Sequence, residues 1–138
     1  MRMGDIVRLY ISADIEGIVH VTSAAHTMPG ASEYDSARRW MTNTVLTAAE
    51  TAHAHGCDEI IVSDSHGNAQ NILPDAMPDY VQLVRGWLRR LSTMEGIDHG
   101  TFDGAIFLGY LAGGMSVGGR SSRVLDQLLV ALRCSKCQ

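Results

Sequence analysis

Apolar residues gather along this chain in short runs, separated by longer polar or amphipathic stretches. Residues 6–13 form the first run, which is rich in Val, Ile, Leu and Tyr and predicts a strand buried on both faces. Residues 59–63, 80–84 and 104–109 are later runs of the same kind. Short apolar runs bounded by turn residues predict further strands.

Between the first two runs the apolar period changes to that of a helix. Ser32 can cap this helix, and Gly56 supplies a stop, which brackets about six turns at 3.6 residues per turn. Strand, long helix and strand form a βαβ unit, which implies parallel strands with a right-handed crossover. The predicted fold class is therefore α/β, with a mostly parallel sheet flanked by helices. The apolar face of the helix is predicted to contain Ala37, Met41, Val45, Ala48, Ala49 and Ala52.

Two more segments have features of helices. Residues 87–94 form a short candidate helix that Gly96 would end. In the tail, an apolar stripe at helical spacing predicts either a helix that covers the sheet or an unpartnered apolar face. This stripe consists of Val124, Leu125, Leu128, Leu129 and Leu132. We expect residues 1–115 to form an α/β metal-binding region and residues 116–138 to form a divergent tail.

The composition excludes several classes of protein. With 138 residues, 46% of them hydrophobic and 19% charged, the chain fits one globular domain. A net charge of −4 argues against nucleic acid as a partner. The chain has neither an apolar stretch that could span a membrane nor a signal-peptide pattern, so we expect a cytoplasmic location. Three cysteines argue against a disulfide framework, and the Cys134–Cys137 pair alone is half a zinc site.

Chemically reactive side chains follow two of the predicted strands. Asp14 and Glu16 come after the first strand, and Asp64 and His66 come after the second. Side chains two residues apart in an extended strand point the same way, so Asp14 and Glu16 would project together. Parallel strands bring both groups to one carboxyl edge, where open α/β sheets bind ligands.

Two carboxylates held this close repel each other unless a cation compensates. Asp14, Glu16 and His66 are a suitable ligand set for zinc, which accepts imidazole nitrogen and carboxylate oxygen. A pair of metal ions sharing a bridging carboxylate is a second possibility. The alternative is a structural role, in which the Asp caps a turn and the Glu is solvated.

Three motifs in this order resemble the D-aminopeptidase family of zinc peptidases, of the dipeptide-transport-operon type. They are residues 12–17 (Ser-Ala-Asp-Ile-Glu-Gly), 63–67 (Ser-Asp-Ser-His-Gly) and 107–110 (Phe-Leu-Gly-Tyr). The resemblance implies a two-zinc enzyme that removes N-terminal D-residues from short peptides and forms ring-shaped homo-oligomers. It also implies that Asp14 bridges both ions and that Glu16 and His66 complete the first site. Asp64 would then support the His ligand or shape its loop.

The sequence departs from this family at the second zinc. Leu111 stands where the family motif Gly-Tyr-His-Ala has a ligating His, and leucine has no lone pair to offer. The resemblance also implies a further Glu ligand and a catalytic His, neither of which has a match in the tail, and a carboxyl-terminal half that is absent. We hypothesise a truncated or frameshifted gene. Three interpretations stay open: an impaired zinc aminopeptidase, a non-catalytic metal-binding or assembly subunit, and a truncated relic.

Overall fold

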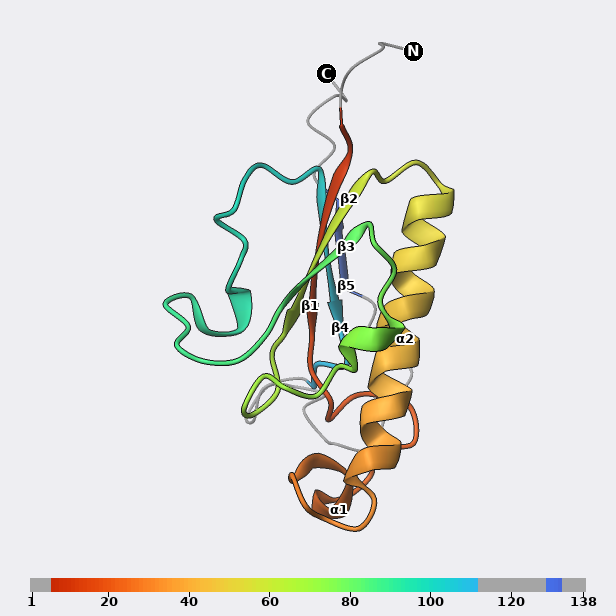
Figure 1. Cartoon of the computed structure of the whole chain (residues 1–138), viewed down its shortest axis with the longest axis vertical. Coiled ribbons are helices and arrows are strands. Elements are labelled where there is room, and N and C mark those ends of the chain that lie inside the picture. Colours follow the sequence, from red (N-terminus) through yellow and green to blue (C-terminus); the bar gives the residue numbers. More distant parts are fainter. Residues whose placement is uncertain (1–5, 112–128, 133–138) are drawn as a thin grey trace.

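The computed structural model describes residues 6–111 and the backbone of residues 129–132, and it contains one five-stranded sheet (Figure 1). The strand order is β3-β2-β1-β4-β5, and the first four of these strands run parallel to one another. The α/β fold with a mostly parallel sheet is thus confirmed. The strands are β1 (Arg8–Ala13), β2 (Glu59–Asp64), β3 (Val81–Val84), β4 (Gly104–Leu108) and β5 (Leu129–Leu132).

Helix α2 (Tyr34–Ala54) connects β1 to β2 and lies along one face of the sheet (Figure 1). It ends where it was predicted to end, because Gly56 adopts a positive φ of 96° that favours glycine. Its predicted start was less accurate. The N-cap residue is Glu33, which makes no side-chain capping bond, so the expected cap at Ser32 is wrong. A short helix, α1 (Ala24–Thr27), interrupts the preceding loop.

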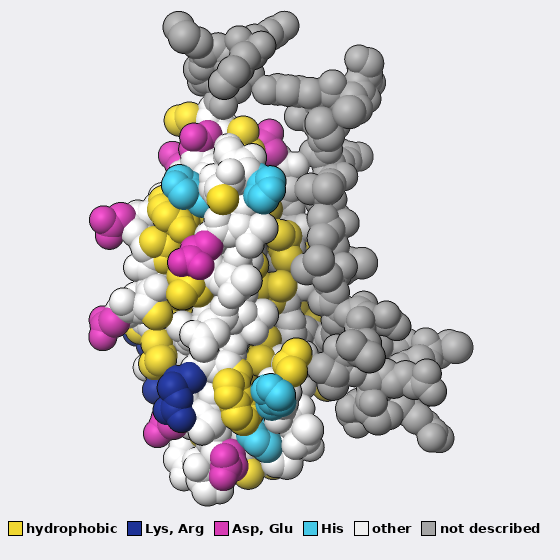
Figure 2. All heavy atoms as spheres, turned by 90° about the vertical axis from the view of Figure 1, so that its right-hand side faces the viewer, with side chains coloured by type: hydrophobic (Ala, Val, Ile, Leu, Met, Phe, Trp, Pro, Cys, Tyr) yellow, Lys and Arg dark blue, Asp and Glu magenta, His cyan; other side chains and the backbone are white. Residues whose placement is uncertain are grey.

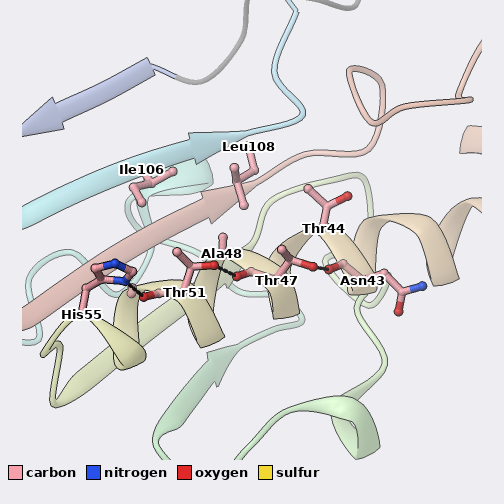
Figure 3. Close-up of a pocket in the computed structure, with 9 residues that line it drawn as sticks. Asn43, Thr44, Thr47, Ala48, Thr51, His55, Ile106 and Leu108 are labelled. Carbon is pink, nitrogen blue, oxygen red and sulfur yellow. Dashed lines mark hydrogen bonds between the residues drawn. The ribbon is translucent and has the colours of Figure 1, made fainter.

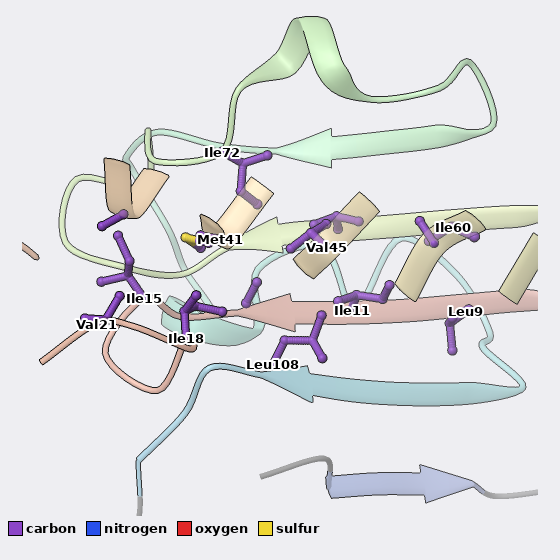
Figure 4. Packing of buried hydrophobic residues seen from close by; sticks show 14 of the residues in the cluster. Leu9, Ile11, Ile15, Ile18, Val21, Met41, Val45, Ile60, Ile72 and Leu108 are labelled. Carbon is purple, nitrogen blue, oxygen red and sulfur yellow. The ribbon is translucent and has the colours of Figure 1, made fainter. Parts of the chain in front are cut away.

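The hydrophobic core lies between α2 and alternate residues of the sheet (Figure 4). Ile11 of β1 and Val62 of β2 belong to the same buried cluster as Met41 and Val45 of the helix, and all four side chains are fully buried. Removing such side chains from water stabilises a fold by about 1.5–3 kcal/mol each. The predicted apolar face of α2 is the face that packs here, since its six members are either buried or packed against this cluster.

The opposite face of the sheet is covered by residues 85–103, which are mostly irregular (Figure 1). The predicted helix over residues 87–94 is wrong, because only a 3₁₀ turn, η2 (Ser92–Met94), forms there. Arg89 explains part of the difference. Its guanidinium donates hydrogen bonds to the carbonyls of Val84 and Gly86 and to the hydroxyl of Ser63, so the segment follows the end of the sheet.

A second 3₁₀ turn, η1 (Pro74–Ala76), lies between β2 and β3. The described residues contain no helix long and apolar enough to cross a membrane.

The structure of residues 129–132 differs from the helix predicted for the tail. Residues 129–132 form β5, which pairs antiparallel with β4, so the predicted helix is wrong over this part. An apolar run at the edge of a sheet can satisfy its backbone groups by pairing with the last strand, and β4 provides that partner. The rest of the predicted helix, the Cys134–Cys137 pair and the expected boundary between residues 115 and 116 lie outside the described residues.

Candidate metal centre

The site is built from two loops that leave neighbouring parallel strands at the same edge. Ala13 ends β1 directly opposite Asp64, the last residue of β2. The amide of Ser65 donates to the carbonyl of Ala13 at 2.8 Å, so the two chains stay side by side as they leave the sheet. The loop that starts at Asp14 therefore leaves the sheet beside the loop that contains His66.

Two glycines allow the Asp14 loop to lie tightly against the end of β4. The amide of Asp14 donates to the carbonyl of Leu108 at 2.8 Å, and the amide of Gly17 donates to the carbonyl of Gly109 at 2.7 Å. A Cβ atom at Gly17 would stand only 2.7 Å from that carbonyl oxygen. Gly109 also has a φ of 69°, and a Cβ there would collide with the carbonyl oxygen of Asp14. This close approach fixes the backbone that carries Asp14 and Glu16.

The structure brings Asp14, Glu16 and His66 together. Their potential ligand atoms all lie within 4.8 Å of one another. The Nδ1 atom of His66 is 3.2 Å from Asp14 Oδ1 and 3.1 Å from Glu16 Oε2. These three side chains are the one such group of potential metal ligands among the described residues.

The imidazole of His66 is oriented by a contact on its other side. Its Nε2–H donates to the carbonyl of Thr27, the last residue of α1, at 2.8 Å. A neutral His66 with this bond in place carries its free lone pair on Nδ1, facing the two carboxylates. Metal-binding histidines are commonly held in this way, with the second ring nitrogen donating to a carbonyl or a carboxylate.

The three groups strongly perturb one another's proton affinities. Partial burial alone would lower the pKa of His66, but its hydrogen bonds to Asp14 and Glu16 outweigh burial and raise the pKa to about 10. Burial raises the pKa of Asp14 to about 6. Burial also acts to raise the pKa of Glu16, yet hydrogen bonds from His66 and Asp14 outweigh it and lower the pKa to about 2. A proton on His66 therefore provides the positive charge that this acidic pair needs.

The donor set fits zinc. Two carboxylates and one neutral imidazole are ligand types that zinc accepts, and three protein ligands leave a position open for water, as catalytic zinc sites do. Binding a cation here requires His66 to release its Nδ1 proton. The site can thus exchange the proton on His66 for a metal cation.

Asp64, the last residue of β2, is fully buried. Its carboxylate accepts hydrogen bonds from the amides of Asn71 and Ile72 and from the Asn71 side chain. These contacts connect Asp64 to the loop that follows His66. Sequence reasoning missed both Asn71 and Thr27, because neither their residue types nor their spacing indicates contact with His66.

Leu111 follows Tyr110 at the end of β4 and is 38% exposed. The Tyr110 hydroxyl contacts Ser12 Oγ, which ties this segment to the sheet beneath the site. An aliphatic side chain at position 111 offers a metal ion no ligand atom.

A groove of about 700 Å³ lies elsewhere, between α2 and β4 (Figure 3). Figure 2 shows hydrophobic side chains on the face of the molecule that carries α2. Thr44, Thr47 and Thr51 donate their hydroxyl protons to helix carbonyls four residues earlier, so these donors are already used. The described lining residues of this groove include none of the three candidate ligands.

Fold and site together define an α/β protein with a candidate metal centre at the carboxyl edge of a parallel sheet. The D-aminopeptidase family model matches residues 7–122, and the chain belongs to this family of peptidases. The resemblance indicated by the three sequence motifs is thereby confirmed.

Two individual proteins are similar to this chain. A D-aminopeptidase of Bacillus subtilis (strain 168) is 34% identical over 106 residues, which cover 77% of this chain and 38% of that relative. A solved structure of DppA from Bacillus subtilis, described as a Zn-dependent D-aminopeptidase and a self-compartmentalizing protease, matches with a TM-score of 0.76 at 33% identity. The match covers 80% of this chain and 40% of the DppA chain. The chain thus spans about two fifths of the length of these relatives.

Proposed function

We propose that this chain binds zinc through Asp14, Glu16 and His66, as part of an aminopeptidase that removes N-terminal D-residues from short peptides. The observation that carries the proposal is the convergence of the three potential ligand atoms within 4.8 Å. Membership of the D-aminopeptidase family supports the reaction, and the Zn-dependence of DppA supports the metal.

A zinc ion held here would lower the pKa of a bound water and polarise a peptide carbonyl. The residues of the chain supply the rest. Asp14 and Glu16 offer two anionic oxygens, and His66 offers Nδ1 once its proton has left. The carbonyl of Thr27 accepts the hydrogen bond from Nε2–H of His66, which keeps Nε2 turned away from the carboxylates and Nδ1 turned toward them.

We infer one zinc ion per chain and reduced catalysis. Leu111 occupies the position of the family's His ligand to a second ion, so that ion would lack a ligand. Asp14 would then bind one ion instead of bridging two. Metal ions provide several kcal/mol of transition-state stabilisation, so losing one of a pair should slow hydrolysis strongly.

A second candidate function is a non-catalytic metal-binding or assembly subunit. The exposed aliphatic side chain of Leu111 favours it, since such a chain keeps one site without completing the other. We also propose a homo-oligomer, which the self-compartmentalizing character of DppA supports. Hydrolysis of D-alanyl peptides or of D-alanine amide separates the enzyme from the assembly subunit.

The zinc assignment is tested by measuring the metal content of the purified full chain and its Asp14→Asn variant. We expect one zinc ion per wild-type chain and near-complete loss in the variant, because an amide oxygen has no charge to offer. Asp75→Asn is the matched control, since Asp75 is exposed in η1 and is not one of the three candidate ligands. Equal zinc content in wild type and Asp14→Asn would refute the assignment.

A further inference from the structure

Asn71 lies five residues beyond His66 and is fully buried, although it belongs to no sequence motif described above. Its side-chain nitrogen donates to Asp64 Oδ1 at 2.8 Å and to the carbonyl of His66 at 2.7 Å. Its side-chain oxygen accepts the hydroxyl proton of Tyr34 at 2.6 Å. Both amide protons therefore face acceptors and the oxygen faces a donor, which determines the orientation of the amide group.

The backbone of Asn71 is held from both sides as well. Its amide donates to Asp64 Oδ2 at 2.6 Å, which ties it to the end of β2. Its carbonyl accepts a hydrogen bond from Arg38 Nε of α2 at 2.9 Å. The loop that begins at His66 is thus connected at Asn71 to the sheet and to the long helix at once.

This arrangement bears directly on His66. Thr27 holds only the ring, whereas the backbone of His66 is held through its carbonyl, which accepts from Asn71 Nδ2 and from the amide of Ala69 at 2.8 Å. Without the Asn71 side chain, the Ala69 contact would remain inside the same loop, and the side-chain tie to Asp64 and Tyr34 would be lost. His66 could then take up other positions, and a bound metal would have to order it again.

We propose that Asn71, supported by Tyr34, is a positioning residue that holds His66 in the geometry needed to bind zinc. The inference rests on the proposed zinc site and adds two residues that do not touch the metal. Tyr34 is the first residue of α2. The helix that packs on the core therefore also supports His66, through Asn71, at the edge of the sheet.

The test is a titration of the metal-free full chain with zinc, and with cobalt(II) as a spectroscopic probe, for wild type, Asn71→Ala and Tyr34→Phe. Losing a group that orients a metal ligand typically weakens binding by about 10- to 100-fold, and we expect a loss in that range for Asn71→Ala. Tyr34→Phe removes one oxygen and leaves both Asn71 Nδ2 bonds in place, so its loss should be smaller. Tyr80→Phe is the matched control, because the Tyr80 ring stacks on His53 near the other end of α2.

The cobalt absorption spectrum of each saturated variant reports the arrangement of ligands around the metal, which a loss of stability alone does not change. We expect an altered spectrum for Asn71→Ala and a wild-type spectrum for Tyr80→Phe. Wild-type affinity and spectrum in both test variants would overturn the positioning role. If Asn71→Ala does not fold, Tyr34→Phe decides by itself. A wild-type chain that binds neither metal would instead overturn the zinc site, and the positioning role with it.

Discussion

The two faces of the sheet are covered in different ways. Helix α2 covers one face through apolar contacts, with Met41 and Val45 packed on the strands. Residues 85–103 cover the other face, and there the sheet offers hydrogen-bond donors: the hydroxyl of Tyr10 donates to the carbonyl of Glu95, and that of Ser12 to the carbonyl of Thr93. A helix pairs its own backbone groups, whereas an irregular segment needs partners from its surroundings. The sheet provides these partners as side chains.

The difference follows from the alternation of side chains along a strand. Ile11 and Val62 point to the helix, while Ser12 and Ser63 point to the irregular segment. The candidate metal centre lies where the strands end, and side chains on both faces of the sheet contact the segments that leave the strands there. Asp64 and Asn71 hold the His66 loop on the helix side, and Ser12 contacts Tyr110 from the other side.

The largest expected effect concerns the helix face. Met41→Ala should lower the free energy of unfolding by about 2–5 kcal/mol, because Met41 is fully buried and its truncation leaves a cavity. Urea unfolding of the full chain measures this change. Met28→Ala is the control, since Met28 is 60% exposed and should change stability by no more than about 0.5 kcal/mol. A similar small change in both variants would mean that the helix face contributes little to stability.

The next effect concerns the sheet edge where the two faces meet. In the metal-free chain, His66 has a folded pKa of about 10, raised from 6.5. Below pH 6.5 the folded and unfolded states both hold this proton, so its stabilising contribution is fully present. As the pH rises toward 10 the unfolded state releases the proton first, and this contribution is progressively lost. Stability, measured by urea unfolding in the presence of a chelator, should therefore fall between pH 6.5 and about 10.

His66→Gln removes the group responsible and should flatten this pH dependence. The carboxylates do not alter the sign in this range, because Glu16 has a pKa of about 2 and Asp14 one of about 6. An unchanged slope in His66→Gln would assign the pH dependence to other groups.

The smallest effect concerns the face covered by residues 85–103. Tyr10→Phe should lower stability by about 1 kcal/mol, because it removes one hydrogen bond to the carbonyl of Glu95 and keeps the buried ring. Thermal or urea unfolding measures the change, with Tyr80→Phe as the control for loss of a phenol hydroxyl. A loss as large as that of Met41→Ala would show that the polar contacts of this face matter as much as the apolar contacts of the other.

Elements that satisfy their own hydrogen bonds, or that bury an apolar run, could be predicted from the sequence. Helix α2 and its stop at Gly56 are examples, and so are the first two parallel strands. The segment around Arg89 could not be predicted, because its conformation depends on carbonyls and a hydroxyl supplied by distant residues. β5 could not be predicted either, since only the free edge of β4 makes a strand more favourable there than a helix.

The same distinction holds for the candidate site. The sequence by itself predicted that Asp14, Glu16 and His66 lie at one edge of the sheet. The order strand, helix, strand implies parallel pairing, and side chains along a strand alternate in direction. Only the tertiary structure decided which nitrogen of His66 faces the carboxylates, and that Thr27 and Asn71 hold it there. Those contacts join residues far apart in the chain or on different sides of a turn. Their distances depend on how the helices pack on the sheet, and that packing leaves no periodic pattern in the sequence.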